Sequence, residues 1–216
     1  MGNMELIIWD WNGTLLNDVD ACVKAMNIML KCRNMVVLYP HQYKEIFTFP
    51  VQDYYQILGF NFEKEPFEDL SIEYISLYKE LSKESQLHNS AIEVLNEFRI
   101  NGIEQVILSA SEQGALEDQV NQHKISNYFQ SLIGLNNIHA KSKLQNALNY
   151  INESKVSLLK TCLIGDTYHD YEVARSIGCK CILINNGHQN LNKYSYHDEN
   201  LLVNNLENVL DLHILV

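Results

Sequence analysis

The sequence of 216 residues predicts an α/β protein in which a doubly wound parallel sheet forms the core and an all-helical segment is inserted after the first strand. Apolar runs of strand length recur along the chain, with helical patterns between them. The runs are continuously apolar, which is typical of strands that are buried on both faces of a parallel sheet. Between residues 18 and 86 no convincing run of this kind occurs, and helical patterns take its place.

Six apolar runs mark the expected strands of the core. They comprise residues 6–9, 106–108, 132–133, 162–164, 181–184 and, more weakly, 201–203. The helices between them have end signals as well: Ser90 with Glu93 and Ser142 with Gln145 match capping boxes, and Gly178 follows the last turn of a third helix. Strands that alternate with helices in this way predict a Rossmann-like sheet.

The helical stretch interrupts this alternation and predicts a second domain. Its helical patterns lie around residues 23–30 and 70–81, and Pro50 and Gly59 separate them. We therefore expect an α/β core domain made of residues 1–17 and 87–216, and a helical domain made of residues 18–86.

Charge and composition exclude several classes of partner. A formal net charge of -11 disfavours nucleic acid and anionic membranes, which prefer a basic surface. No apolar run approaches the length of a membrane span, and the N-terminal segment lacks the cationic region and cleavage site of a signal peptide. The five cysteines form no C-x-x-C pair, so we expect reduced thiols. These features predict a cytoplasmic protein that binds neither nucleic acid nor membranes. They do not determine the oligomeric state, for which we expect a monomer or a homodimer.

Polar residues follow the apolar runs at the positions where chemistry is expected. Ligands of an open α/β sheet bind beyond the carboxyl ends of its strands. Asp10 follows the first run, Ser109 follows the second, and Asp166 and Asp170 follow the fourth. Two carboxylates and a hydroxyl, together with an amine, should therefore converge on one crevice.

A lysine between the third and fourth runs completes this set; Lys143 is the preferred candidate and Lys141 is its alternative. A carboxylate can attack phosphorus and form an aspartyl phosphate. Mg²⁺ takes oxygen ligands and neutralises charge on the transferred group. Hydroxyl and ammonium donors can then hold the remaining phosphoryl oxygens. The residues therefore predict phosphoryl transfer at a Mg²⁺ site.

The motifs occur in the order known from one superfamily. The chain resembles a haloacid dehalogenase superfamily hydrolase with a helical cap after the first strand, similar to phosphoglycolate phosphatase and β-phosphoglucomutase. The superfamily's first motif, D-x-D-G-T-L, matches residues 10–15 except at Asn12. Its other motifs are a strand ending in Ser or Thr, a Lys, and G-D-x-x-x-D, which match Ser109, Lys143 and residues 165–170.

The resemblance implies a role for each acidic residue. Asp10 would be the nucleophile that attacks phosphorus. Asp10, Asp166 and the backbone carbonyl of Asn12 would ligate Mg²⁺. Asp170 would act from behind these ligands or orient the lysine.

The resemblance also implies which residues bind the substrate. Thr14, Ser109 and Lys143 would contact the phosphoryl oxygens. The substrate would be a small phosphorylated metabolite, chosen by the helical cap.

Asn12 is the departure that matters most. In phosphatases of this superfamily an Asp at this position protonates the leaving alkoxide and then activates water. An amide cannot exchange a proton in this way, and general acid–base catalysis contributes roughly 10²–10⁴ in rate. We therefore expect a phosphatase that is slow or restricted to good leaving groups, with His169, His139 and Glu112 as candidates for a substitute acid.

Two alternatives follow from the same departure. Dehalogenases and phosphonatases of the superfamily also lack an Asp here, and a phosphonatase would need a cap lysine, for which Lys24, Lys31 and Lys44 are available. The other alternative is a non-hydrolytic protein that binds a phosphate or a metabolite.

Overall fold

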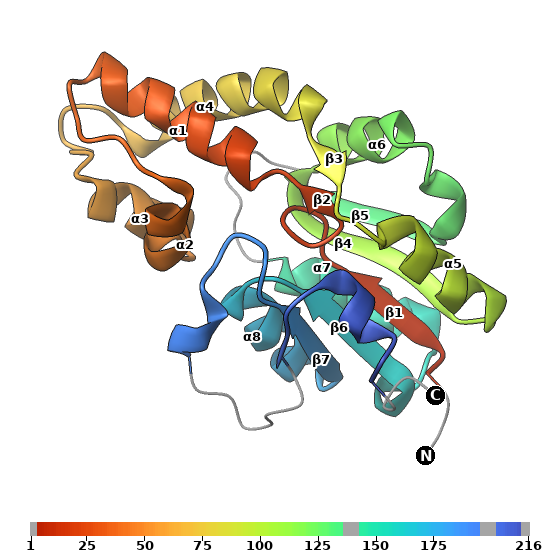
Figure 1. The fold of residues 1–216 in the computed structure, drawn as a ribbon. Coiled ribbons are helices and arrows are strands. Elements are labelled where there is room, and N and C mark those ends of the chain that lie inside the picture. The colour runs from red at the N-terminus through yellow and green to blue at the C-terminus, as the bar shows by residue number, and fades with distance from the viewer. Residues whose placement is uncertain (1–3, 136–142, 195–201, 213–216) are drawn as a thin grey trace.

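The computed structural model describes residues 4–135, 143–194 and 202–212, and it confirms the predicted fold class. A six-stranded sheet with the order β5-β4-β1-β6-β7-β8 forms the core, and all its strand pairs are parallel (Figure 1). The strands are β1 (Leu6–Trp9), β4 (Glu104–Glu112), β5 (Ser131–Leu135), β6 (Thr161–Gly165), β7 (Lys180–Ile184) and β8 (Leu202–Val203).

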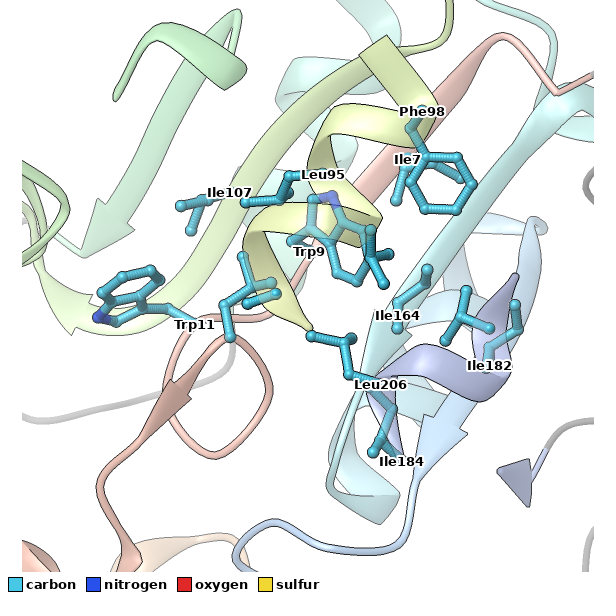
Figure 2. Close-up of a cluster of buried hydrophobic side chains, with 14 of the residues drawn as sticks. Ile7, Trp9, Trp11, Leu95, Phe98, Ile107, Ile164, Ile182, Ile184 and Leu206 are labelled. Atoms are coloured by element: carbon cyan, nitrogen blue, oxygen red, sulfur yellow. The ribbon is translucent and has the colours of Figure 1, made fainter. Parts of the chain in front are cut away.

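Strand β1 lies in the middle of the sheet and shows why its residues are continuously apolar. Ile7 and Trp9 belong to one buried cluster, and Leu6 and Ile8 belong to another, because successive side chains point to opposite faces. Figure 2 shows the first cluster, in which Trp9 lies among side chains from helix α5 and the neighbouring strands. Both faces of the sheet are therefore covered, as in a doubly wound fold.

Four helices provide this cover. Helices α5 (Ala91–Ile100) and α6 (Gln113–Gln122) contribute to the cluster of Ile7, whereas α7 (Leu144–Ser154) and α8 (Tyr168–Ile177) contribute to the cluster of Leu6. Gly178 ends α8 in a left-handed conformation with a φ of 82°, as its position in the sequence predicts.

The segment after β1 is mostly helical, as predicted. It contains α1 (Val19–Cys32), α2 (Pro40–Ile46), α3 (Val51–Leu58) and α4 (Phe67–Leu81). These helices lie together beside the sheet (Figure 1). They have a buried cluster of their own, which includes Met26, Tyr55 and Leu70. A short antiparallel pair, β2 (Leu16–Asn17) with β3 (Gln86–Leu87), joins the two ends of the segment. The segment is therefore not wholly helical.

Several local expectations need correction. Ser90 makes no capping hydrogen bond; it has a φ of 64°, and its hydroxyl donates to Glu207. Strand β4 continues beyond residue 108 to Glu112, with a register shift against β5, so Ser109 lies within a strand and does not follow one. The capping position Ser142 lies outside the described residues.

Candidate active site

A tight turn after β1 forms the floor of the site. Asp10 directly follows the strand, and its backbone N–H donates to the carbonyl of Ile164 at 2.8 Å. Gly13 has a φ of 75°, and a Cβ atom on it would lie 2.4 Å from Oδ2 of Asp166. The turn brings back Thr14, whose hydroxyl donates to Oδ1 of Asp166 at 2.8 Å. A residue without a side chain is therefore required at position 13.

Three buried carboxylates meet above this turn. Asp10, Asp166 and Asp170 each offer an oxygen, and these oxygens lie within 4.8 Å of one another. The exposed fractions of the three residues are 7%, 0% and 1%. The structure thus brings together the acidic residues that the sequence singles out at the ends of β1 and β6.

Lys143 lies between two of these carboxylates. Its Nζ is 2.5 Å from Oδ1 of Asp10 and 2.6 Å from Oδ1 of Asp170, and it donates to the carbonyl of Leu108 at 3.1 Å. The backbone N–H and hydroxyl of Thr167 donate to the other oxygen of Asp170, at 3.0 and 2.6 Å. Lys141, the alternative lysine, lies outside the described residues.

The charges in this cluster are incompletely balanced. Burial raises the pKa of Asp10 well above its ordinary value, although Lys143 opposes this effect. Burial likewise raises the pKa of Asp166. Burial acts in the same direction on Asp170, but Lys143 and the hydrogen bonds from Thr167 outweigh it, so the pKa of Asp170 is lowered. One lysine therefore does not neutralise three carboxylates.

The donor set fits a hard divalent cation. All three side chains offer carboxylate oxygens, which are the ligands that Mg²⁺ prefers. Burial raises the pKa values of Asp10 and Asp166, and a bound cation would lower them again. Asp10, Asp166 and Asp170 could accordingly hold a metal ion.

Asn12 occupies a fully hydrogen-bonded position beside the cluster. Its Nδ2 donates to Oδ2 of Asp18 at 2.8 Å and to the hydroxyl of Tyr78 at 2.7 Å. Its Oδ1 accepts from the hydroxyl of Ser111 at 2.6 Å, and that of Ser109 lies 3.5 Å away. Because Asp18 only accepts hydrogen bonds, the amide nitrogen of Asn12 must face it.

Asp18 and His188 form a buried ion pair that the sequence analysis missed. Nε2 of His188 lies 3.1 Å from Oδ1 of Asp18, and its Nδ1 lies 2.9 Å from the hydroxyl of Tyr43. Burial alone would lower the pKa of His188, but Asp18 outweighs burial and raises this pKa to about 9. The backbone N–H of His188 donates to Asp166 at 2.6 Å. His188 therefore links the carboxylate cluster to helix α2.

A positional signal for His188 exists in the sequence. The residue follows β7 by four positions, so it lies beyond the carboxyl end of a strand, as Asp10 and Asp166 do. Gly187 precedes it, and a Cβ atom there would lie 2.1 Å from Oδ2 of Asp166. The sequence pair of residues 187–188 thus belongs to the site.

The proposed substitute acids differ in their suitability. Glu112 accepts hydrogen bonds from the backbone N–H groups of Gly114 and Ala115, which lower its pKa, so it is ionised at neutral pH and is a poor acid. Burial lowers the pKa of His169, which favours the neutral ring. His139 lies outside the described residues.

The predicted phosphate ligands are placed differently from one another. Lys143 lines the cavity above the carboxylates, whereas Thr14 and Ser109 are fully buried and are not among its lining residues. The hydroxyl of Thr14 is engaged by Asp166. Ser111, two residues beyond Ser109, does line the cavity.

A cavity of about 230 Å³ opens above the cluster. Asp10, Lys143 and Asp170 line one side, and side chains of the helical segment line the other. The latter are largely aromatic, among them Phe47, Phe49, Tyr55, Phe67, Tyr74 and Tyr78. Lys24, Lys31 and Lys44 are not among the lining residues, so the described structure offers no cap lysine for imine formation.

Comparison with known families identifies the class of protein. The sequence profile of a family described as haloacid dehalogenase-like hydrolase matches residues 7–184. This match spans most of the chain, and the protein belongs to this family of hydrolytic enzymes. A comparison with curated proteins found no match.

Solved structures share the fold over nearly the whole chain. A haloacid dehalogenase-like hydrolase from Streptococcus pneumoniae matches with a TM-score of 0.81 and 19% identity, covering 98% of this chain and 99% of the other. A predicted phosphoglycolate phosphatase from Haemophilus somnus matches with a TM-score of 0.76 and 17% identity, covering 98% of each chain. A mutant of CbbY from Rhodobacter sphaeroides in complex with xylulose-(1,5)bisphosphate matches with a TM-score of 0.71 and 15% identity, covering 94% of this chain and 95% of the other. At these identities the likeness concerns the fold.

Among residues 4–135, 143–194 and 202–212, none of the helices combines the length and apolar character that crossing a bilayer requires.

Proposed function

We propose that the protein is a Mg²⁺-dependent phosphatase that hydrolyses a small phosphorylated metabolite through an aspartyl phosphate at Asp10. The observation that carries this proposal is the meeting of Asp10, Asp166, Asp170 and Lys143 in one cluster, of which Asp10, Asp170 and Lys143 line the cavity. The chain's agreement in fold with proteins described as a putative phosphatase and a predicted phosphoglycolate phosphatase supports it.

The chain's own residues suit the first half of the reaction. An oxygen of Asp10 would attack phosphorus, and the bond to the leaving oxygen would break. Lys143, 2.5 Å from Asp10, favours the anionic form of this nucleophile and faces the transferred group's negative charge. Mg²⁺, held by Asp10, Asp166 and the backbone carbonyl of Asn12, with Asp170 behind them, would neutralise phosphoryl charge when bound. Thr14 and Ser109 remain candidates for contacts to the phosphoryl oxygens.

Asn12 limits the reaction. Its amide cannot protonate a leaving oxygen, so substrates with weakly basic leaving groups should react fastest. Water must then attack the aspartyl phosphate without help from a carboxylate at this position. The protein should therefore accumulate the intermediate more readily than a phosphatase with an intact acid.

Other parts of the proposal rest on composition and packing. We infer a cap domain from residues 18 to 86, because helices α1–α4 have their own buried cluster. We infer a cytoplasmic location, because all five cysteines are free thiols. A monomer or homodimer remains the expected oligomeric state.

The decisive experiment traps the intermediate. The protein is mixed with Mg²⁺ and an acyl or phenolic phosphate, quenched in acid and measured by mass spectrometry. One added phosphoryl group on Asp10 is expected, and Asp10→Asn should show none. Absence of the adduct, together with no phosphate release from any substrate, would reject the phosphatase in favour of a binding role.

A second experiment restores the missing acid. Asn12→Asp should raise turnover of an alkyl phosphate more than that of a phenolic phosphate, since only the alkoxide needs a proton. In this variant the new carboxyl would face Asp18, because the amide of Asn12 lies 2.8 Å from it. The matched control is the double variant in which Asn12→Asp is combined with Asp18→Asn, because this pair then still consists of one carboxyl and one amide. Equal turnover of both substrates in all variants would show that position 12 is not the acid's place.

A further inference from the structure

The walls of the cavity differ sharply in chemical character. The side formed by the core carries the charges of Asp10, Asp170 and Lys143. The side formed by the helical segment is mainly aromatic and aliphatic; Phe47, Phe49, Phe67 and Ile75 are examples. A phosphoryl group placed on the carboxylates would therefore leave the rest of the substrate against an apolar wall.

Among the residues that the structure describes, the cavity has no spare cation for a second anionic group, since burial lowers the pKa of the lining residue His169 and favours its neutral ring. Among the described lining residues, Lys143 is paired with Asp10 and Asp170, and His188 is paired with Asp18. No arginine lines the cavity in the described part of the chain. A second phosphate or a carboxylate would thus be desolvated without a partner, which is costly.

Several polar groups of the apolar side are already engaged. The hydroxyl of Tyr43 bonds with His188, and that of Tyr78 donates to Asp18 at 2.6 Å. The hydroxyl of Ser71 donates to the carbonyl of Phe67 at 2.8 Å. These three groups are not free to satisfy a sugar-like leaving group with several hydroxyls, whereas the hydroxyl of Tyr54, which also lines the cavity, has no hydrogen-bond partner in the described structure.

The size of the cavity suits one aromatic ring. Apolar cavities of roughly 150 Å³ can hold benzene, and this cavity measures about 230 Å³. Aromatic rings also pack well against the edges and faces of aromatic side chains.

Asn12 points to the same kind of leaving group independently. A phenol has a pKa of about 10, as the side chain of tyrosine does, and aliphatic alcohols are much weaker acids. A phenolate can therefore leave without the proton that Asn12 is unable to supply. The apolar wall and the missing acid thus select one class of molecule.

We propose that the substrate is a phosphate monoester of an apolar phenol. The inference rests on the proposed phosphatase function. Asp10 forms a bond to phosphorus while the bond between phosphorus and the phenolic oxygen breaks. The phenolate leaves with the electron pair of that bond and takes a proton from solvent. Water then attacks the aspartyl phosphate and releases inorganic phosphate.

The test compares four phosphates with Mg²⁺. They are 4-methylphenyl phosphate, 4-carboxyphenyl phosphate, 2-phenylethyl phosphate and glycerol 1-phosphate, so that leaving-group acidity and polarity vary separately. We expect kcat/KM for the methylphenyl ester to exceed that for each of the others by at least about tenfold, the size of effect that pocket contacts produce. A carboxyphenyl or glycerol ester that reacts as fast would overturn the substrate class and leave the phosphatase intact.

Paired variants of helix α4 locate the effect. Ile75 lines the cavity, whereas Ile72 on the same helix does not and is 55% exposed. Ile75→Lys should shift the preference toward 4-carboxyphenyl phosphate by about tenfold or more, because it supplies a cation, and Ile72→Lys should leave the ratio unchanged. Equal ratios in both variants would contradict the proposal.

A binding measurement separates the two levels of failure. Asp10→Asn, which cannot form the intermediate, should bind 4-methylphenyl phosphate more tightly than glycerol 1-phosphate in calorimetry. Selective binding without turnover by the wild type would support the pocket and reject the phosphatase. Tighter binding of glycerol 1-phosphate would reject the aryl substrate whether or not turnover occurs.

Discussion

Replacing Lys143 by methionine removes the cation that lies between two buried carboxylates. The side chains of Lys143, Asp10 and Asp170 are 3%, 10% and 1% exposed, so water cannot replace the lost charge fully. Thr167 still donates to Asp170, whereas among the described residues Asp10 keeps only the hydroxyl of Thr14, which lies 3.5 Å away and donates to Asp166 at 2.8 Å. Breaking a buried pair by removing one partner costs about 3–5 kcal/mol. We expect a loss of this size at neutral pH without divalent cation.

The assay is urea unfolding of the wild type and Lys143→Met, with Lys160→Met as the matched control. Lys160 lies 2.5 Å from Glu5, but both side chains are at least 40% exposed. Such surface pairs contribute about 0–1 kcal/mol. Methionine preserves the unbranched apolar stem at both positions, so the comparison isolates the buried charge.

The pH dependence gives a further check. Burial already raises the pKa of Asp10, and loss of Lys143 should raise it more. A carboxyl whose pKa is higher in the folded than in the unfolded protein lowers the free energy of unfolding, fully so at a pH above the folded pKa. The effect disappears at a pH below the unfolded pKa, which is about 4. The deficit of Lys143→Met should therefore shrink as the pH falls from neutral toward this value. A deficit under about 1 kcal/mol, unchanged by pH or by Mg²⁺, would refute the role of Lys143 as counterion.

The carboxylate cluster, a helix cap and an unpaired hydroxyl yield the remaining predictions. Mg²⁺ should raise the thermal midpoint of the wild type in calorimetry, because it binds the native state. The variant Asp166→Asn should lose most of this gain, whereas Asn12→Ala should lose little of it. Equal losses in the two variants would contradict the ligand set. Glu112→Ala removes the cap of α6 and should cost about 1 kcal/mol at neutral pH. Because the folded pKa of Glu112 is lowered, this loss should fade as the pH drops through that pKa, and a pH-independent loss would exclude the charged cap. The hydroxyl of Tyr54 is buried without a hydrogen-bond partner in the described structure, so Tyr54→Phe should leave the urea midpoint unchanged or raise it; a marked drop would reveal a partner.

The sheet was predictable because each of its strands contains a short apolar run that is followed by a polar residue, although β4 extends beyond its run. Burial on both faces imposes that pattern on Leu6–Trp9, and the rule that ligands lie beyond carboxyl ends leads directly to Asp10 and Asp166. Asp10 and Asp166 are far apart in sequence, yet the parallel pairing of β1 with β6 brings them side by side. Topology alone therefore accounts for the meeting of these carboxylates.

The contacts between the helical segment and the core were not predictable in the same way. Asp18 and His188 are separated by 170 positions, and their pairing depends on where the helical segment rests on the core. No periodicity in the sequence reports that placement. The failed cap at Ser90 has a similar cause, since its left-handed backbone and its bond to Glu207 are determined by tertiary contacts.

Asn12 brings the local and the tertiary observations together. Its nitrogen donates to Asp18 while its oxygen accepts from Ser111, so an amide satisfies both neighbours, and an ionised carboxylate would meet Asp18 without a shared proton. The amide is thus an integrated part of a complete hydrogen-bond network, which argues against simple decay of the site. Under the proposed function, a site with Asp10 and Lys143 but without an acid at position 12 would still transfer phosphoryl groups from weakly basic oxygens. The aromatic wall that faces it would hold leaving groups of that kind.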